Sequence, residues 1–263
     1  MRSVLTIAGS DSSGGAGIQA DLKTCAALGV YGTCAVTALT AQNTVRVTAV
    51  HEVPAGIVAA QIDAIVADIR PDAVKTGMLA NAAIVEVVAV KVSEHALRHL
   101  VVDPVMLAKS GDRLLREDGV QALRERLLPL AEVVTPNLPE AEALVGHELR
   151  SEADIRDAAR EIQAMGARNV VITGGHRPGE SVVDLLYDGD AFQAFSAPRV
   201  ETQSTHGTGC TFASAIAAFL ARGESVADAV GHAKDYVTEA IKRAAPIGHG
   251  HGPVHHFWQW FKN

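Results

Sequence analysis

The chain of 263 residues is 48% hydrophobic and 20% charged, which is enough apolar content for a full core and excludes a disordered protein. Its 30 acidic and 23 basic side chains leave a net charge of −7, so we expect no nucleic-acid partner, because binding to phosphates needs a basic surface. The apolar runs fall short of the roughly 20 residues of a bilayer span, so no membrane partner is expected either. Three cysteines without C-x-x-C spacing favour a cytoplasmic location over a disulfide framework.

Short strand-like runs rich in Val, Ile and Thr alternate with longer amphipathic segments along the chain. The predicted strands are residues 4–8, 33–39, 73–75, 100–103, 132–135 and 170–173. The predicted helices are residues 18–28, 55–69, 81–95, 120–128, 139–144, 151–165, 209–220 and 226–244. This alternation predicts one α/β domain over residues 1–263, with a central, mostly parallel sheet and helices on both faces.

Local signals refine this pattern. Asp188-Gly189, between strand-like residues 181–187 and 191–196, is typical of a type I′ hairpin turn. Asn81 is a candidate N-cap, and Ser151 followed by Asp154 predicts a capping box. Because open α/β sheets bind ligands beyond the carboxyl ends of their strands, we expect the chemistry in the loops that follow the strands.

A glycine-rich loop over residues 9–17 joins the first predicted strand to the first predicted helix. Gly15-x-Gly17-x-x-Ala20 matches the loose dinucleotide-binding pattern, but no acidic residue follows at the spacing expected of a ribose partner. The chain also has no G-x-x-x-x-G-K-[ST] sequence, so a P-loop is absent. The glycines therefore indicate either a close ligand approach or simply a tight turn between strand and helix.

A second loop, residues 205–211 with the sequence THGTGCT, precedes a helix built of small residues. Consecutive backbone N–H groups at a helix N-terminus form an anion-binding site. Cys210 falls in the first turn, where the helix dipole favours a thiolate. Packing of a small buried cysteine against the sheet explains the motif equally well.

Several motifs taken together narrow the interpretation. They are IAGSDSSGGAGIQAD at residues 7–21, ALTAQNT at 38–44, KTGML at 75–79, DPVM at 103–106, AKSG at 108–111, TPNLPEAE at 135–142, GTGC at 207–210 and GPV at 252–254. In this order they resemble the hydroxymethylpyrimidine/phosphomethylpyrimidine kinases of thiamine biosynthesis, within the ribokinase-like superfamily. The resemblance covers the whole chain.

The resemblance implies a ribokinase-like α/β fold, usually as a homodimer, with ATP and Mg²⁺ as cofactors. It implies two successive phosphoryl transfers, first to the hydroxymethyl group of 4-amino-5-hydroxymethyl-2-methylpyrimidine and then to the resulting monophosphate. A pyridoxal kinase of the same superfamily is a rival interpretation, although Gln42 and Met78 favour the pyrimidine. A catalytically silent protein that binds the pyrimidine as a sensor is a second rival.

Catalytic roles follow from the resemblance. Related sugar kinases have an Asp at the position of Cys210 that accepts the hydroxyl proton, and a thiolate could do the same. The backbone N–H groups of Gly207, Thr208, Gly209 and Cys210 would hold the oxygens of the transferred phosphoryl group. Ordinary packing remains the alternative for Cys210.

The substrate contacts implied by the resemblance are Gly9, Ala16, Asp21, Gln42, Met78 and Val105. Gln42 carries a donor and an acceptor on one planar amide, which matches the amine and adjacent ring nitrogen of an aminopyrimidine. Gly9 and Ala16 would form the floor of the site and Asp21 a polar contact. Met78 and Val105 would form apolar walls, with core packing as their alternative.

The cofactor contacts implied are Lys109, Asn137, Thr173, Gly175, Thr208 and Thr211, with Asp103 and Glu140 near the metal. Asn137 and Glu140 have the N-x-x-E spacing of the superfamily, although an N-cap with a first-turn acid explains it too. Many relatives have Lys where this chain has Thr173, and a hydroxyl brings no charge to a phosphate. This departure predicts weaker ATP binding, unless Lys109 supplies the missing charge; exposure of Lys109 to solvent alone is the alternative.

The tail carries four of the 11 histidines in residues 249–256. We expect this segment to be a loop that closes the site or a surface segment, rather than a metal site.

Overall fold

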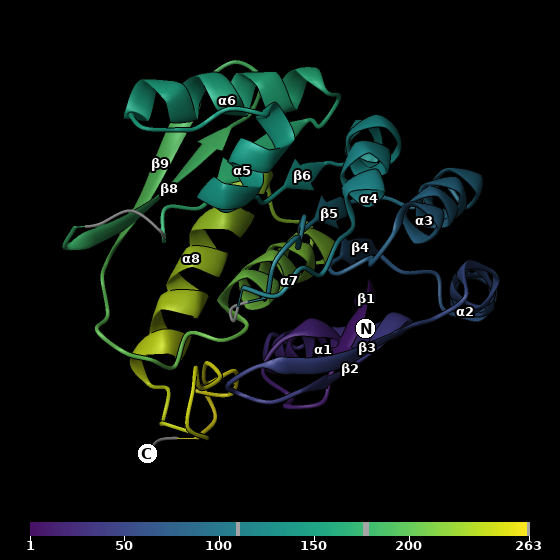
Figure 1. The fold of residues 1–263 in the computed structure, drawn as a ribbon, viewed down its shortest axis with the longest axis horizontal. Coiled ribbons are helices and arrows are strands. Elements are labelled where there is room, and N and C mark those ends of the chain that lie inside the picture. The colour runs from purple at the N-terminus through teal and green to yellow at the C-terminus, as the bar shows by residue number, and fades with distance from the viewer. Residues whose placement is uncertain (109–110, 176–178, 262–263) are drawn as a thin grey trace.

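The computed structural model describes residues 1–108, 111–175 and 179–261. Within these residues a nine-stranded sheet has the order β3-β2-β1-β4-β5-β6-β7-β8-β9 (Figure 1). The strands are β1 (Ser3–Asp11), β2 (Tyr31–Gln42), β3 (Val47–Glu52), β4 (Ala73–Thr76), β5 (Leu100–Val102), β6 (Val133–Val134), β7 (Asn169–Ile172), β8 (Ser181–Tyr187) and β9 (Phe192–Pro198). Six neighbouring strands pair in parallel, namely β2, β1, β4, β5, β6 and β7. Strand β3 at one edge and strands β8 and β9 at the other edge pair in the antiparallel direction.

Helices cover both faces of the sheet, as predicted. They are α1 (Gly17–Ala27), α2 (Ala55–Asp68), α3 (Ala82–Glu94), α4 (Glu117–Ala122), α5 (Leu138–Val145), α6 (Glu152–Ala164), α7 (Thr208–Ala221) and α8 (Val226–Lys242). Apolar residues of α1, α7 and α8 form one core layer, and those of α2 to α6 form the other. Because both faces are covered, the central strands are apolar on both sides, as in Leu100–Val102.

The strand order reverses between β1 and β4, which are neighbours in the sheet but lead to helices on opposite faces. Such a reversal opens a crevice at the carboxyl ends of the two strands, because the following loops diverge. The loop after β1, residues 12–16, and the loop after β4, residues 77–81, begin at this crevice.

Local signals are confirmed in most places. Asn81 caps α3 by accepting the N–H of Ile84 at 3.0 Å, and Ser151 and Asp154 form the predicted capping box of α6. The hairpin of β8 and β9 is also confirmed, but its turn is not a two-residue type I′ turn. Tyr187 pairs with Phe192, so four residues form the loop, in which Asp188 accepts two backbone N–H groups.

Two segments differ from the prediction. Strand β3 was not predicted, because its polar and exposed residues lack the alternation of a half-buried strand. The helix predicted over 120–128 begins earlier at Glu117 and continues through a π-helical turn (Leu123–Leu127) into a 3₁₀ turn (Leu128–Leu130). Pro129 removes a backbone donor there and ends the regular helix. No helix among the described residues is long and apolar enough to cross a membrane.

Candidate active site

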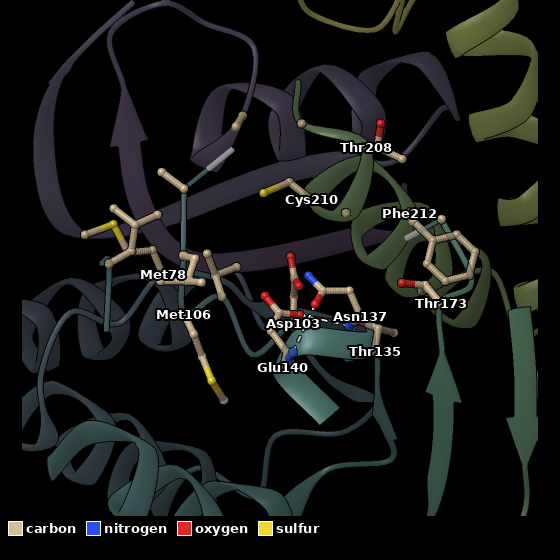
Figure 2. A pocket seen from close by; sticks show the side chains of 18 of the residues that line it. Met78, Asp103, Met106, Thr135, Asn137, Glu140, Thr173, Thr208, Cys210 and Phe212 are labelled. Atoms are coloured by element: carbon tan, nitrogen blue, oxygen red, sulfur yellow. Dashed lines mark hydrogen bonds between the residues drawn. The ribbon is translucent and has the colours of Figure 1, made fainter. Parts of the chain in front are cut away.

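A cavity of about 1180 Å³ opens where the parallel strands end (Figure 2). Its wall combines the loops after β1, β4, β5, β6 and β7 with the first turn of α7. The predicted site residues in this wall are Gly9, Ala16, Gln42, Met78, Asp103, Val105, Asn137, Glu140, Thr173, Gly175, Gly207, Thr208, Gly209 and Cys210. The topology therefore brings together site residues that lie far apart in the sequence, from Gly9 to Cys210.

Three predicted contacts do not lie in this wall. Asp21 is fully buried beneath the cavity and does not line it, so the predicted direct substrate contact does not fit its position. Thr211 is also fully buried, and its hydroxyl pairs with Nε2 of His256 at 3.1 Å rather than facing a nucleotide. Lys109 lies outside the described residues.

In the first glycine loop, the side chain of Asp11 binds the backbone N–H groups of the loop itself. Asp11 Oδ2 accepts the backbone N–H groups of Ala16 at 2.8 Å and Gly15 at 3.2 Å, and Oδ1 accepts that of Ser13 at 2.8 Å. These N–H groups are therefore not available to a phosphate. A side chain on Gly17, which has φ = +56°, would place its Cβ 2.3 Å from the oxygen of Gly9, so this turn requires glycine.

The second glycine loop keeps free donors at the cavity. The first helical hydrogen bond of α7 runs from the N–H of Thr211 to the oxygen of Gly207, so the helical ladder does not use the N–H groups of Gly209 and Cys210. The N–H of Thr208 instead donates to the oxygen of Thr205 at 3.3 Å. Gly207 has φ = +81°, and a Cβ there would lie 1.8 Å from the oxygen of Gly15, so the two loops meet through glycine.

Buried charges surround the Cys210 thiol. Burial raises its pKa to about 12, although Lys75 and the N–H of Gly17 lower it, so the thiol is protonated at neutral pH. The prediction that Cys210 is a thiolate is therefore wrong for the protein without substrates. Desolvation of the thiolate outweighs the stabilisation that the helix N-terminus gives it. Asp103 and Asp21 push the pKa further upward.

Lys75 is a buried charged residue for which the sequence alone indicated no role. Its Nζ lies 3.0 Å from Asp21 Oδ1 and 3.7 Å from Asp103 Oδ2, and its side chain is fully buried. Burial opposes its charge, but Asp21 and its other negative neighbours outweigh this and raise its pKa. Asp21 also accepts the hydroxyls of Thr6 at 2.5 Å and Ser214 at 2.6 Å. The one available signal was a lysine inside an otherwise apolar strand, where a buried partner is required.

Asp103 and Glu140 lie close together in the wall of the cavity (Figure 2). Burial raises the pKa of both carboxyls, and the charge of Asp103 adds to the rise at Glu140. Oδ2 of Asp103 is buried without a hydrogen bond, while Glu140 Oε2 accepts the N–H of Asn137 at 2.9 Å in a capping box. Two adjacent carboxyls, one with an oxygen that accepts no hydrogen bond and has Lys75 Nζ at 3.7 Å, would suit Mg²⁺, which binds through one or two carboxylates together with water and phosphate.

The substrate end of the cavity is apolar. A Cβ on Gly9 would lie 3.0 Å from Met78 Sδ, so the absence of a side chain lets the methionine lie against the strand. Met78 and Val105 both line the wall, as predicted. Gln42, at the end of β2, lines this side of the cavity together with polar residues such as Asp11 and His206.

The opposite end of the cavity has a buried ion pair that the sequence did not indicate. Lys234 Nζ donates to Asp184 Oδ2 at 2.8 Å, and Asp184 Oδ1 accepts the N–H of Gly174 at 2.9 Å. This fixes the loop that begins at Thr173, next to Arg199, which donates to the oxygen of Gly175 at 3.2 Å. Two basic side chains thus lie beside Thr173, where the family resemblance implies a lysine.

The histidine-rich tail lies against the second glycine loop. The N–H of His206 donates to the oxygen of Gly252 at 2.9 Å, and the N–H of Val254 donates back to His206 at 3.3 Å. The N–H of His251 donates to the oxygen of Thr44 at 2.9 Å, which ties the tail to the β2–β3 connection as well. The tail therefore packs against the loops that border the cavity without lining the cavity itself, and whether it closes the site stays a prediction.

Comparisons with known proteins agree with this geometry. Residues 11–255 match the family model described as phosphomethylpyrimidine kinase. The chain is 50% identical over 254 residues to the hydroxymethylpyrimidine/phosphomethylpyrimidine kinase of Bacillus subtilis, covering 96% of this chain and 94% of that protein. It is 54% identical over 254 residues to the thiamine biosynthesis bifunctional protein ThiED of Geobacter sulfurreducens, with 97% of this chain matched but only 52% of that protein.

A solved structure has the same fold. Bacillus subtilis pyridoxal kinase in complex with ADP superimposes with a TM-score of 0.91 at 44% identity, over 97% of each chain. The ordered glycine loops, the paired carboxyls and the near-complete match to the family model lead to one conclusion. The chain belongs to the phosphomethylpyrimidine kinase family.

Proposed function

We propose that this protein transfers phosphate from ATP to 4-amino-5-hydroxymethyl-2-methylpyrimidine and then to its monophosphate, with residues 1–263 forming one kinase domain. One observation carries the proposal. The N–H groups at the start of α7 and the carboxyl pair of Asp103 and Glu140 face the same cavity (Figure 2). Phosphoryl transfer is catalysed mainly by positioning and by stabilising charge from two sides, and this arrangement supplies both.

The pyrimidine lies in the apolar end of the cavity. Its ring fits between Met78 and Val105, above the floor of Gly9 and Ala16. Gln42 pairs with the exocyclic amine and the adjacent ring nitrogen through its amide. This contact fixes the ring, so that the hydroxymethyl group points to the first turn of α7.

Cys210 accepts the proton of the hydroxymethyl group after its thiol has first released its own proton to solvent. The transition state of phosphoryl transfer is loose, so the proton leaves late and the strength of the base matters less than its position. Lys75 is the cation that favours the thiolate against the burial that disfavours it. The N–H groups of Gly209 and Cys210 hold the oxygens of the phosphoryl group in flight.

Asp103 and Glu140 would hold Mg²⁺, which would neutralise charge on the phosphate oxygens. Asn137 keeps Glu140 in place through the capping box, in which each side chain bonds the backbone of the other. At the other end, Thr173, Gly175 and Thr208 contact the nucleotide phosphates, all three from the cavity wall. Arg199 supplies positive charge near Thr173, since the charge of Lys234 is balanced by Asp184.

Assembly as a homodimer is part of the proposal and rests on the family resemblance. An equilibrium sedimentation measurement tests it, since a mass of about twice the 27.5 kDa of the chain is expected.

Pyridoxal is the second candidate substrate. The observation that favours it is the 44% identity and TM-score of 0.91 to the Bacillus subtilis pyridoxal kinase. The apolar walls accept either flat ring, so the choice depends on which ring substituents meet the polar groups.

An ADP-release assay separates these candidates. The protein is incubated with MgATP and, in turn, with the hydroxymethylpyrimidine, its monophosphate and pyridoxal. We expect ADP with both pyrimidines, at a kcat/KM above that for pyridoxal. ADP release with pyridoxal alone would support the second candidate, and none with any acceptor would support a binding protein without turnover.

A further inference from the structure

Asp184 and Lys234 form a buried ion pair in the wall of the cavity, at the end that the proposed function gives to the nucleotide. Lys234 Nζ lies 2.8 Å from Asp184 Oδ2, and both side chains are 6% exposed. Asp184 is on β8 and Lys234 is on α8, so the pair connects the sheet to a helix. The phosphoryl transfer proposed above gives no role to either residue.

The other oxygen of Asp184 holds a turn of the backbone. Oδ1 accepts the N–H of Gly174 at 2.9 Å. Gly174 lies directly against β8, because a Cβ there would clash with the oxygen of Val183. The residue before it, Thr173, donates its N–H to the oxygen of Pro136 at 3.0 Å. The turn that follows β7 is therefore held from both sides, by the loop after β6 and by the side chain of Asp184.

This turn, residues 173–175, is the proposed contact for the nucleotide phosphates. Thr173, labelled in Figure 2, and Gly175 both line the cavity. The turn has no basic side chain, since its sequence is Thr-Gly-Gly. Its interaction with a phosphate therefore depends on neutral hydrogen bonds, which weaken steeply when their angle falls below about 120°. The placement of the turn must accordingly decide how well it binds a phosphate.

A carboxylate that holds this turn has an advantage and a disadvantage. Its hydrogen bond to a backbone N–H is roughly twice as strong as that of a neutral acceptor. Its negative charge, however, would repel the phosphates of ATP in the same cavity. Lys234 removes the disadvantage, because its ammonium group offsets the charge of Asp184 from hydrogen-bond distance.

We propose that Asp184 and Lys234 are positioning residues for ATP. Asp184 holds the turn of residues 173–175 in the geometry that binds the phosphates, and Lys234 neutralises the carboxylate that does so. This rests on the proposed function, since the turn must contact the nucleotide. The pair acts through the backbone of the turn, and neither side chain touches the reacting atoms.

A purely structural role makes a different prediction. As a connection between β8 and α8 alone, the pair would change the free energy of unfolding, and the folded fraction of a variant would bind ATP as the wild type does. Replacement of a buried ion pair by apolar side chains of similar volume is often neutral for stability. Such a replacement therefore separates the two roles in a folded protein.

The experiment measures the dissociation constant of MgATP by isothermal titration calorimetry without acceptor, and the KM for the pyrimidine by ADP release. Asp184→Leu/Lys234→Met removes the ion pair together with the hydrogen bond to Gly174. We expect this variant to bind MgATP about 10-fold more weakly, because it has lost one charge-assisted hydrogen bond at the turn. The KM for the pyrimidine should stay unchanged, since that ring lies at the other end of the cavity.

Asp184→Asn/Lys234→Met is the matched variant. It also lacks the ion pair, but it keeps an oxygen that accepts the N–H of Gly174. A neutral acceptor retains about half of the strength of a carboxylate, so this variant should bind MgATP about 3-fold more tightly than Asp184→Leu/Lys234→Met. Loss of a connection between β8 and α8 would affect the two variants equally.

Lys234→Met alone tests the second half of the proposal, even if the Leu variant fails to fold. It keeps the hydrogen bond to Gly174 but leaves the charge of Asp184 uncompensated, so MgATP should again bind about 10-fold more weakly. Arg2→Met/Asp72→Leu is the control. Asp72 likewise accepts a backbone N–H, from Ser3 at 2.8 Å, and pairs with Arg2 at 2.6 Å, but it lies at the amino ends of the strands. The control should bind MgATP as the wild type does.

The outcomes separate the proposal from the function on which it rests. Equal affinity of the two double variants of Asp184 for MgATP, or wild-type affinity in Lys234→Met, overturns the proposal. A higher KM for the pyrimidine in place of weaker MgATP binding overturns it too. A wild-type protein that does not bind MgATP, or that binds it without phosphorylating the pyrimidine, would instead overturn the proposed function.

Discussion

Lys75 Nζ lies 3.0 Å from Asp21 Oδ1, and neither side chain has more than 1% of its surface exposed. The pair connects β4 to α1, and Asp21 also accepts the hydroxyl of Ser214 on α7. The helix that carries Cys210 is thus anchored to the sheet through a buried carboxylate. Asp103, 3.7 Å from the same Nζ, extends the charge network to the cavity wall.

Loss of Lys75 should be strongly destabilising. Lys75→Met leaves two buried carboxylates without their cation, and removal of one partner from a buried ion pair costs about 3–5 kcal/mol. Urea unfolding of the variant and the wild type measures the difference. Lys91→Met, at an ion pair with Asp63 on the surface, is the control and should hardly move the midpoint. Equal midpoints for Lys75→Met and wild type would contradict the role of the network.

Cys210→Ala should lower kcat by about 100-fold or more, because a positioned proton acceptor contributes about 10²–10⁴ in rate. The KM values for both substrates should change little, since the thiol contacts only the reacting hydroxyl. Steady-state kinetics give both quantities. Cys34→Ala, at a half-buried cysteine on β2, is the matched control and should retain activity. Near-wild-type turnover in Cys210→Ala would remove the catalytic assignment.

Gln42→Leu should raise the KM for the pyrimidine by about 10- to 100-fold, because a lost paired hydrogen bond costs about 1–3 kcal/mol. The KM for ATP should stay the same, since the amide lies at the other end of the cavity. Initial rates at varied concentrations of each substrate measure the two constants. An unchanged KM for the pyrimidine would show that the amide does not touch the ring.

His256 should make the protein sensitive to acid. Burial lowers its pKa to about 3 from the ordinary value of 6.5, so the unfolded chain binds a proton that the folded protein does not. Stability is therefore fully present above pH 6.5 and falls by about 1.4 kcal/mol per unit as pH decreases below it. Unfolding curves between pH 7 and pH 5 should show a smaller loss in His256→Gln, which keeps an acceptor for Thr211. His255→Gln is the control, and parallel curves for all three proteins would contradict the prediction.

The sequence predicted the layers of the fold well, because alternating strand and helix patterns report directly on burial. It located the two glycine loops and the N-x-x-E pair, since these are local motifs at strand ends. It missed β3, whose pairing with β2 depends on a tertiary contact rather than on its own composition.

Partners distant in sequence account for the other differences. Asp21 had the chemistry of a substrate contact, but the helical pattern could not show that Lys75, 54 residues later, reaches it first. The position of Cys210 was predicted while its protonation state was not, because the helix dipole is visible in the sequence and desolvation is not. The pairing of Asp11 with His206 spans 195 residues and has no local signal.

The proposed function depends on transfer of phosphate to the hydroxymethyl oxygen of the pyrimidine. Phosphorus NMR of a reaction with ATP and 4-amino-5-hydroxymethyl-2-methylpyrimidine follows the product directly. We expect a phosphomonoester resonance coupled to the methylene protons, followed by a diphosphate, and neither signal with Cys210→Ala in the same time. Consumption of ATP without a phosphorylated pyrimidine, or products that form equally fast in the variant, would contradict it.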